Sequence, residues 1–399
     1  MDYNEFMFSF LKREKSMFAT DLEANSNKLA DNIRGKQILI IGGAGTIGSS
    51  FLKAALKFEP KKVVIVDINE NGLTELVRDL RSTQNQFIPH EFFTYPLSFD
   101  NPAFFKLFKS HGPFDIVANF AAHKHVRSEK DIFSIEALLE NNIIKAKGLL
   151  DLLVNYPPAH FFCVSTDKAA NPVNIMGASK KLMEELILTY SAFFKITTAR
   201  FANVAFSNGS LLEGFIKRIE KHQPLACPSD VKRFFVTPQE SGEICLMACI
   251  LGNNSDVFFP KLDMVNDLVN FSEIYGPLLS NFGFEPLIVD SEEIAKEKVS
   301  EMKMGKYPVF LFKSNTSGEK LFEEFYTDDE NVELNKFDSL GYISKNATYS
   351  KDEMDIILNE LKTILSFDNT TKKDIVNLLK KYITNFDHIE TGLGLDSKM

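Results

Sequence analysis

The sequence predicts an α/β protein built on a doubly wound parallel sheet, with a smaller substrate-binding lobe in its C-terminal part. Three observations support this class. Short apolar runs of strand length alternate with helix-like segments between residues 35 and 205. These runs lack alternating polar residues, as in strands that are buried on both faces of a sheet. The chain has 399 residues, 44% of them hydrophobic, which is ample for a large core.

The expected strands are, in chain order, Gln37–Ile41, Val63–Val66, Ile116–Phe120, Phe161–Val164 and Ile196–Ala199. Helices are expected between them at Ser49–Phe58, 132–154 and 177–194. Residues 35–205 should therefore form one domain. After it the pattern loosens and prolines mark turns, so residues 206–345 are expected to form the lobe, partly interleaved with the sheet.

Helical extensions are expected at both ends of the chain. Residues 1–34 have the pattern of one or two amphipathic helices. Four apolar residues of this segment should pack against the main domain or a second subunit: Phe6, Phe8, Phe10 and Leu11. Residues 346–399 form a second extension, in which a charged helical block at 350–385 precedes a tail without periodicity.

Composition excludes several classes of function. A net charge of −9 argues against a nucleic-acid partner held by general electrostatics. No run of about 18 apolar residues and no signal-peptide core occurs, so we expect a cytoplasmic protein without a membrane span. Four scattered cysteines fit a reducing compartment. Cys245 and Cys249 could share a helix face, but they lack further ligands, and no metal site is expected.

A glycine-rich loop follows the first expected strand and opens a helix. This context lets backbone amides approach a pyrophosphate at the positive end of the helix. Asp67 lies 19 residues after the last of these glycines, where a carboxylate would bind a ribose 2′-hydroxyl and repel a 2′-phosphate. The sequence therefore predicts a dinucleotide site, with NAD favoured over NADP. The expected loop contacts are Gly42, Gly45, Thr46, Ile47 and Gly48.

Six further motifs fall in the order and spacing of one family. From the glycine loop to about residue 340, the chain resembles the extended short-chain dehydrogenase/reductases of Rossmann fold, and specifically the UDP-N-acetylglucosamine 4,6-dehydratases of bacterial glycan synthesis. Two positions depart from the family pattern: Leu97 replaces an Asp near the adenine, and Arg127 replaces a Pro. The six motifs are Ala121–Val126, Ser165–Pro172, Asn174–Lys180, Arg200–Val204, Arg233–Thr237 and Gly318–Glu324.

The resemblance implies a dehydration that starts with oxidation of the sugar at C4 by hydride transfer to NAD, which is recycled when the hydride returns to C6. It implies that Lys168 takes the C5 proton, Asp167 protonates the departing C6 hydroxyl and Thr166 binds the C4 oxygen. Lys180 should bind the nicotinamide ribose and, as a cation, favour a developing alkoxide.

Met176 stands where such dehydrogenases usually have a tyrosine, four residues before the lysine. A thioether cannot donate or take a proton, so the acid/base work falls to the Thr-Asp-Lys segment. Ordinary core packing is the alternative role for this methionine. Deprotonation of the C4 hydroxyl could run through Thr166 and Asp167 or through an ordered water. The Met-containing helix resembles that of the C5-retaining, mostly membrane-anchored dehydratases, of which this chain would be a version without the anchor.

The resemblance also implies further contacts to the cofactor and the substrate. Asn142 could instead make a core polar contact, Arg233 a surface charge pair and Glu319 a structural ion pair. The expected cofactor contacts are Ala121, Ala122 and Lys124. The expected substrate contacts are Lys124, His125, Asn142, Arg200, Asn203, Arg233, Lys261 and Glu319.

The function expected from these residues is 4,6-dehydration of UDP-N-acetylglucosamine with retention at C5, feeding amino-sugar synthesis for surface glycans. A nucleotide-sugar 4-epimerase is the second hypothesis, although epimerisation needs no acid/base pair at C5 and C6. A non-catalytic NAD-binding regulator is the third. The partner is a UDP-sugar, and we expect a homo-oligomer that forms through the helices flanking the sheet.

Overall fold

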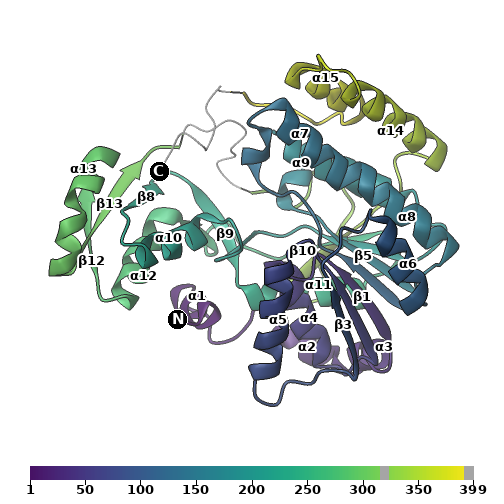
Figure 1. Cartoon of the computed structure of the whole chain (residues 1–399), viewed down its shortest axis with the longest axis horizontal. Coiled ribbons are helices and arrows are strands. Elements are labelled where there is room, and N and C mark those ends of the chain that lie inside the picture. Colours follow the sequence, from purple (N-terminus) through teal and green to yellow (C-terminus); the bar gives the residue numbers. More distant parts are fainter. Residues whose placement is uncertain (315–322, 391–399) are drawn as a thin grey trace.

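A large, mainly parallel sheet forms the centre of the molecule, shown by the computed structural model in Figure 1, which describes residues 1–314 and 323–390. Within these ranges nine strands pair in the order β14-β15-β10-β6-β5-β4-β1-β2-β3. The seven from β10 to β3 are parallel, and β14 and β15 are antiparallel additions. The strands are β1 (Gln37–Ile41), β2 (Lys62–Val66), β3 (Glu91–Tyr95), β4 (Ile116–Asn119), β5 (His160–Val164), β6 (Ile196–Ala199), β10 (Asp256–Pro260), β14 (Val332–Glu333) and β15 (Leu340–Ser344).

The five expected strands are confirmed as β1, β2, β4, β5 and β6, and they are buried as predicted. The edge strand β3 was not foreseen from the sequence. The strands β10, β14 and β15 were not predicted one by one, but they return to the sheet from residues 206–345, the part expected to be partly interleaved with it. In the register, Ile41 pairs with Asn119 and Val164 with Ala199. The carboxyl ends of the central strands therefore meet at one edge.

Helices cover both faces of the sheet, which confirms the doubly wound class. One face packs into a core with α6 (Pro102–His111), α7 (Ile132–Leu139), α8 (Lys145–Asn155) and α9 (Ile175–Leu188). The other packs with α3 (Ser26–Ile33), α4 (Thr46–Leu56), α5 (Glu70–Ser82) and α11 (Pro238–Leu251). The single helix expected over 132–154 is interrupted by a π-helical segment at Glu140–Ile144. None of the helices in the described ranges is both long and apolar enough to cross a bilayer.

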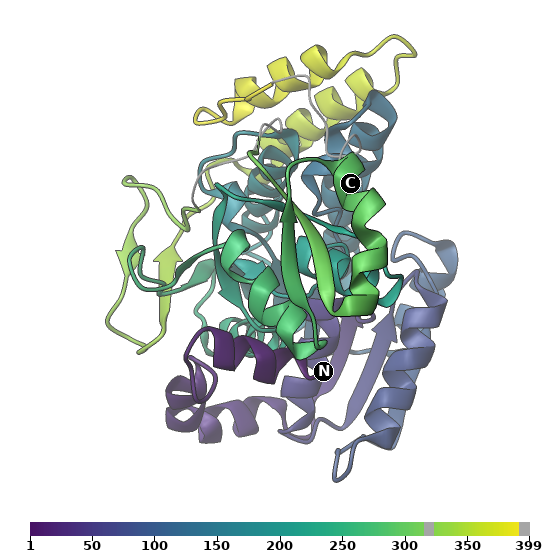
Figure 2. The ribbon, with the colours of Figure 1, turned by 90° about the vertical axis from the view of Figure 1, so that its left-hand side faces the viewer.

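The lobe lies beside the carboxyl edge of the sheet, at the left of Figure 1 and toward the viewer in Figure 2. Two three-stranded sheets build it from the described residues, in the orders β11-β9-β7 and β12-β13-β8. Its strands are β7 (Asn203–Val204), β8 (Leu225–Pro228), β9 (Lys232–Val236), β11 (Leu268–Asn270), β12 (Glu285–Val289) and β13 (Lys306–Phe312). Its helices are α10 (Leu211–Glu220), α12 (Tyr275–Asn281) and α13 (Glu292–Glu297).

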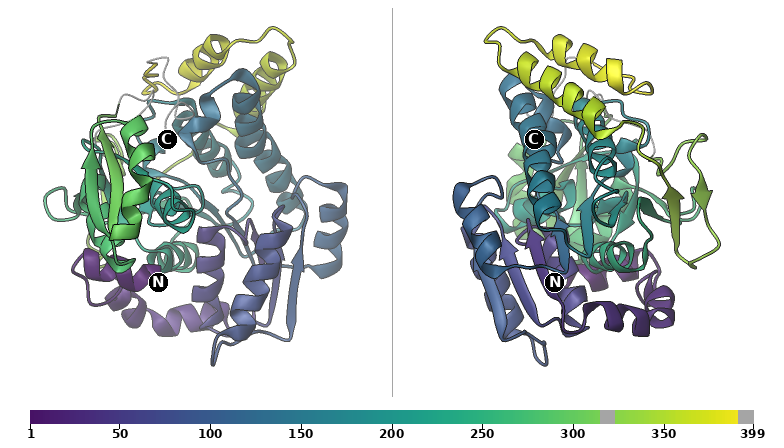
Figure 3. Two further views of the ribbon diagram at one scale, coloured as in Figure 1. Left: turned by 60° about the vertical axis from the view of Figure 1, so that its left-hand side comes forward. Right: turned by 90° about the vertical axis from the view of Figure 1, so that its right-hand side faces the viewer.

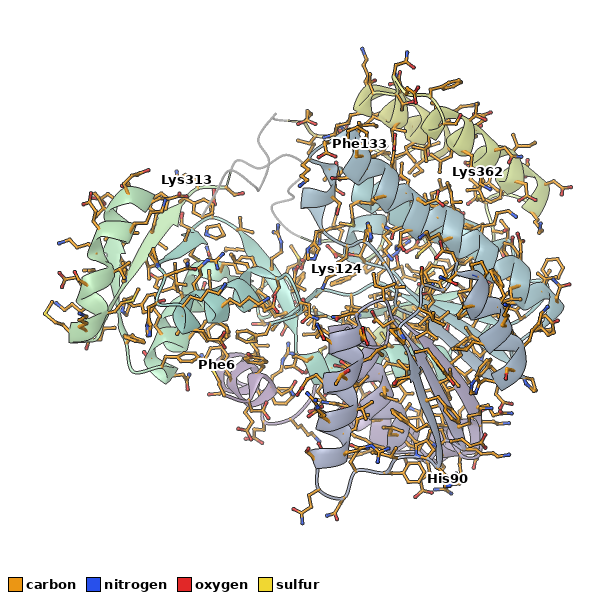
Figure 4. The ribbon with its side chains drawn as sticks, viewed as in Figure 1. Phe6, His90, Lys124, Phe133, Lys313 and Lys362 are labelled. Atoms are coloured by element: carbon orange, nitrogen blue, oxygen red, sulfur yellow. The ribbon has the colours of Figure 1, made fainter. Side chains whose placement is uncertain are left out.

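The N-terminal extension contacts both the lobe and the sheet domain. In α1 (Tyr3–Phe10), Phe6 and Met7 are buried in the core of the lobe (Figure 4), whereas packing against the main domain or a second subunit was expected. After α2 (Ala19–Ala24), α3 packs against the sheet domain instead. Between them, the Arg13 guanidinium lies 3.3 Å from Glu240 of α11 and 3.3 Å from Asp267, near the lobe strand β11.

The C-terminal extension is a helical hairpin of α14 (Lys351–Leu365) and α15 (Lys372–Tyr382). Both helices share the core of α8 and α9 and lie over the outer side of that layer, as Figure 3 shows. The hairpin therefore occupies part of the sheet-flanking helix surface that was expected to carry a subunit contact.

Candidate active site

A cavity of about 590 Å³ lies where the carboxyl edge of the sheet faces the lobe. The segments that follow β1, β4, β5 and β6 line it on one side, and α10, β8 and β9 line it on the other. Lys124 lies between the two parts of the molecule in Figure 4. This position, outside the carboxyl ends of parallel strands, is where open α/β sheets bind their ligands.

The glycine loop has the backbone geometry that close approach of a ligand requires. Gly42 has a φ of +78°, and a Cβ there would lie 2.6 Å from the amide nitrogen of Ala121. A Cβ on Gly48 would lie 2.3 Å from the carbonyl oxygen of Gly42. A Cβ on Gly45 would meet only that same oxygen, at 3.4 Å, so the protein leaves space in front of this residue. The loop can therefore hold a pyrophosphate at the start of α4.

Asp67 is fixed beside this loop. Its Oδ2 accepts a hydrogen bond from the Ala44 amide and its Oδ1 one from the Asn69 amide, both at 2.9 Å. Each oxygen retains a lone pair that can accept a hydroxyl. The carboxylate at the end of β2 thus fits a ribose diol, and it would repel a phosphate at the same place.

The remaining expected cofactor residues also surround the loop. Ile47 and Ala122 line the cavity. The Thr46 hydroxyl accepts a hydrogen bond of 3.1 Å from the amide of Asn208, which ties the start of α4 to the chain that enters the lobe. The Ala121 amide donates to Asn119 Oδ1 at 3.0 Å.

The Thr-Asp-Lys segment forms one connected group in the cavity wall. The Thr166 hydroxyl donates to Asp167 Oδ1 at 2.7 Å, and Lys168 Nζ lies 3.1 and 3.2 Å from the two oxygens of the same carboxylate. Asp167 is 3% exposed, whereas a quarter of the Lys168 side chain is exposed. All three residues line the cavity. A hydroxyl, a buried carboxylate and an amine are therefore in direct contact, which suits proton transfer.

Met176 and Lys180 lie on α9 and both line the cavity. Met176 is buried, and its amide donates to Glu129 Oε1 at 2.9 Å, which holds the first turn of the helix in place. Lys180 is also buried, and its Nζ donates to the Val164 carbonyl at 3.1 Å. Burial lowers the pKa of this lysine. The Met176 thioether adds apolar surface to the cavity wall and has no proton to donate.

Lys124, His125 and Asn203 line the cavity as expected. Lys124 Nζ lies 3.4 Å from the Ser207 hydroxyl, and burial lowers the pKa of this lysine. Gly209 has a φ of +76°, and a Cβ there would lie 2.7 Å from the His125 ring. The histidine is thus packed closely against the start of α10.

The expectation that Arg200 contacts the substrate is corrected by the structure. Arg200 is fully buried, and its nitrogens donate to the carboxylates of Glu184 and Glu330 and to the Phe325 carbonyl, at 2.7 to 3.0 Å. It does not line the cavity. With every guanidinium nitrogen engaged, Arg200 joins β6, α9 and the segment after residue 324.

Three other expected substrate residues also lie outside the cavity lining. Lys261 Nζ donates to the carbonyls of Leu334 and Phe337, which corrects its expected role. The Asn142 side chain accepts a hydrogen bond from the His123 amide and donates one to the His123 carbonyl. It therefore makes a core polar contact, which was the alternative to a substrate contact. Arg233 Nε lies 3.7 Å from Glu323, and this pair is buried, unlike the surface charge pair that was its alternative. Glu319 lies outside the described residues.

Glu323 was missed in the sequence. It is 4% exposed, its Oε2 accepts a hydrogen bond of 2.9 Å from the Phe234 amide, and its Oε1 accepts one from the Asn203 side chain. Burial and the nearby charge of Asp167 raise the pKa of Glu323 to about 7. The motif Gly318–Glu324 contains three acids, and spacing alone did not indicate which of them approaches the Thr-Asp-Lys segment.

Arg218 on α10 was also missed. It lines the lobe side of the cavity together with several aromatic rings, and no other guanidinium lines the part described here. In the sequence, a basic residue near the end of a helix and next to Lys217 cannot be told from an ordinary surface cation. The rings around it belong to Phe215, Phe235, Phe271 and Phe312.

Curated relatives come from both archaea and bacteria. An uncharacterized membrane protein of Methanocaldococcus jannaschii is 29% identical over 351 residues, covering 82% of this chain and 96% of its own. The probable polysaccharide biosynthesis protein EpsC of Bacillus subtilis is 29% identical over 259 residues, 64% of this chain and 42% of EpsC. The capsular polysaccharide biosynthesis protein CapD of Staphylococcus aureus is 26% identical over 371 residues, 90% of this chain and 55% of CapD. The chain thus spans about half the length of these two bacterial proteins.

Solved structures share the fold. Pen from Bacillus thuringiensis superposes with a TM-score of 0.63 at 21% identity, covering 82% of this chain and 98% of Pen. A double mutant of DesIV from Streptomyces venezuelae, a dTDP-glucose 4,6-dehydratase, superposes with a TM-score of 0.54 at 16% identity, covering 72% of this chain and 88% of DesIV. The UDP-glucose 4-epimerase of Thermotoga maritima superposes with a TM-score of 0.54 at 18% identity, covering 73% of this chain and 90% of the epimerase. The sequence profile of the polysaccharide biosynthesis protein family matches residues 38–345, well over half of the chain, and the protein therefore belongs to that family.

Proposed function

We propose that the protein is an NAD-dependent hydro-lyase that converts UDP-N-acetylglucosamine into a UDP-4-keto-6-deoxy sugar with retention at C5. The observation that carries this proposal is the contact of Thr166, Asp167 and Lys168 in the cavity wall. Epimerisation at C4 needs one proton acceptor at one carbon. Loss of water across C5 and C6 also needs a base at C5 and an acid at the C6 hydroxyl. The segment supplies both.

NAD, when bound, supplies the oxidation at C4 and the later reduction at C6. The glycines of the loop leave room for its pyrophosphate, and the fixed carboxylate of Asp67 suits an unphosphorylated ribose better than a 2′-phosphate. Lys180 Nζ, which donates a hydrogen bond to the Val164 carbonyl at the end of β5, is the group that we propose to contact the second ribose.

The contacts support a defined order of proton transfers. Thr166 gives its hydroxyl proton to Asp167 as it takes the proton of the C4 hydroxyl, along the 2.7 Å hydrogen bond. Lys168 enters the cycle as a neutral amine, because its ammonium proton has passed to solvent through the exposed quarter of its side chain. Lys168 then takes the C5 proton while Asp167 gives its proton to the departing C6 hydroxyl. The lysine finally returns a proton to C5, so all protons balance.

The lobe side of the cavity supports a nucleotide as the carrier of the sugar. Arg218 offers a planar fork of donors that suits a diphosphate. The aromatic rings beside it offer faces on which a base can stack. These residues replace Arg200 and Lys261 as the diphosphate contacts that we propose.

Proton NMR of the purified protein with UDP-N-acetylglucosamine in D2O, without added NAD, tests the proposal. A new C6 methyl signal with deuterium at C5 is the expected result, and the H5 couplings of a control in H2O report the configuration. Appearance of the 4-epimer alone would overturn the dehydratase assignment in favour of epimerase chemistry, the activity named for a Rickettsia felis relative that is 28% identical over 236 residues.

A further inference from the structure

We propose that Tyr3 and Phe206 are positioning residues for the cofactor, because their stacked rings hold the segment whose backbone orients the Thr46 hydroxyl toward a dinucleotide pyrophosphate. This inference rests on the proposed function and adds to it a link between the N-terminal helix and the cofactor loop. The segment, which we call the double turn, comprises residues 204–210 and runs from β7 to α10.

The double turn consists of two successive tight turns. The Ser207 amide donates to the Val204 carbonyl at 3.2 Å, and the Ser210 amide donates to the Ser207 carbonyl at 2.8 Å. The third residue of each turn has a positive φ, which is +55° for Phe206 and +76° for Gly209. Turns with a positive φ at this place normally have glycine or asparagine there, because other side chains are strained in that conformation. The first turn therefore has a bulky ring where the second has the usual glycine.

Contacts with α1 oppose this strain. The Phe206 ring is stacked on the Tyr3 ring, with centroids 4.7 Å apart and 16° between the planes, and the Phe6 ring meets it edge-on at 5.8 Å. Such aromatic pairs stabilise a fold beyond the burial of their area, and Phe206 is almost fully buried. A strained residue persists only when its surroundings hold it, and here two rings of α1 do so.

α1 is held firmly enough to act as this support. Asp2 caps its first turn and accepts a hydrogen bond of 2.7 Å from the Asn4 amide. The Asn4 side chain in turn accepts one of 3.0 Å from the Gln239 amide, at the start of α11. Met7, one turn further along α1, is fully buried in the lobe core. Tyr3 therefore belongs to a helix whose place is set by other contacts.

The double turn also contacts the sheet domain. The Asn208 amide donates to the Thr46 hydroxyl oxygen at 3.1 Å, and the Ser207 hydroxyl lies 3.4 Å from Lys124 Nζ. Because Phe206 immediately precedes the two residues that make these contacts, its backbone conformation sets where they lie. A change at Phe206 would therefore move both contacts.

The contact with Thr46 is the one that reaches the cofactor site. A hydroxyl that accepts a hydrogen bond from a backbone amide still has its own proton to donate. Thr46 is the first residue of α4 and follows Gly45, in front of which the protein leaves space. An anion at the start of a helix, such as the pyrophosphate of NAD, is the acceptor that suits this proton. The Asn208 amide therefore aims the Thr46 hydroxyl at the cofactor.

Amide hydrogen exchange and calorimetry on Y3A, Y3F and F10A test the inference. Tyr3 is 37% exposed, so Y3A removes the stacked ring with little loss of unfolding free energy. We expect the Asn208 amide to exchange about 2-fold to 10-fold faster in Y3A, the range that loss of one aromatic pair allows, and the Kd for NAD to rise within that range. Y3F keeps the ring and should match the wild type. F10A is the matched control, because Phe10 lies on the same helix and stacks on Phe6 at 6.3 Å, so its loss leaves the stacked pair intact.

The variant F206G separates the ring from the backbone. Glycine adopts a positive φ without strain, so the double turn should no longer need the support of Tyr3, and adding Y3A to F206G should change neither exchange nor affinity. An added effect of Y3A in this background would overturn the inference. Wild-type exchange in Y3A would do the same, as would an equal change in Y3A and F10A, which would indicate a general loosening of α1. A wild type that dehydrates no sugar would overturn only the proposed function, because exchange and NAD affinity are measured without substrate.

Discussion

The backbone N–H of Asp387 donates a hydrogen bond to the carbonyl oxygen of Pro172, at 3.1 Å. The Ile389 amide donates to the Val173 carbonyl at 2.9 Å, and the Asn385 side chain donates to the Ala170 carbonyl at 2.8 Å. The end of the C-terminal extension therefore holds the loop that joins the Thr-Asp-Lys segment to α9.

Truncation after Thr384 should loosen this loop, because it removes all three hydrogen bonds and the buried ring of Phe386. We expect faster amide hydrogen exchange at residues 169–174 and a lower kcat. Truncation after Glu390 is the control, since it keeps these contacts. Unchanged exchange in the shorter chain would show that the loop keeps its conformation alone.

The substitution T166V removes the hydroxyl through which the C4 proton is proposed to pass, while it keeps the side-chain shape. We expect kcat to fall by about 10²-fold or more with little change in KM, measured by the appearance of the C6 methyl signal. T198V is a matched control, because the Thr198 hydroxyl donates to the Cys163 carbonyl away from the cavity. A T166V enzyme of normal rate would favour a water as the proton acceptor.

The substitution R200M should act on stability. It leaves the buried carboxylates of Glu184 and Glu330 without their shared partner, and breaking a buried ion pair costs about 3–5 kcal/mol. Urea unfolding should show this loss in the free energy of unfolding. The double variant R200M/E184M, which removes the pair together, should recover part of it.

Substitution R218M should act on ligand affinity. Loss of a charged hydrogen-bond partner of a phosphate costs about 1.5–3 kcal/mol, so the Kd for UDP should rise by about 10-fold to 100-fold in calorimetry. The free energy of unfolding should stay close to that of wild type. K217M is the control, because Lys217 precedes it on α10 and is an exposed residue paired with Glu213. Equal affinities would place the diphosphate elsewhere.

The stability of the fold should depend on pH through Glu184. Burial alone would raise the pKa of this carboxyl, but the charge and hydrogen bonds of Arg200 outweigh burial and lower the pKa to about 2. A carboxyl with a lowered pKa in the folded state contributes stability above its unfolded pKa of about 4.3, and the contribution is lost as the pH falls toward 2. Unfolding free energies measured between about pH 7 and pH 3 should fall in wild type and fall less in E184Q.

The sequence alone predicted those features of the site that depend on residues close together in the chain. The glycine loop, the carboxylate at the end of β2 and the Thr-Asp-Lys contact all follow from local order, and the structure brings them to one edge of the sheet. Arg200 could not be placed in this way. Its partner Glu330 is 130 positions away, and only the folded chain shows that an arginine suited to a phosphate serves two internal carboxylates instead.

The first 33 residues bridge the two sides of the cavity. α1 packs into the lobe core, α3 packs against the sheet domain, and Arg13 pairs with a residue on each side. A change in the distance or angle between the lobe and the sheet would therefore have to bend or break this connection. The relative position of the two cavity walls is in this way tied to a segment that precedes the first strand of the sheet.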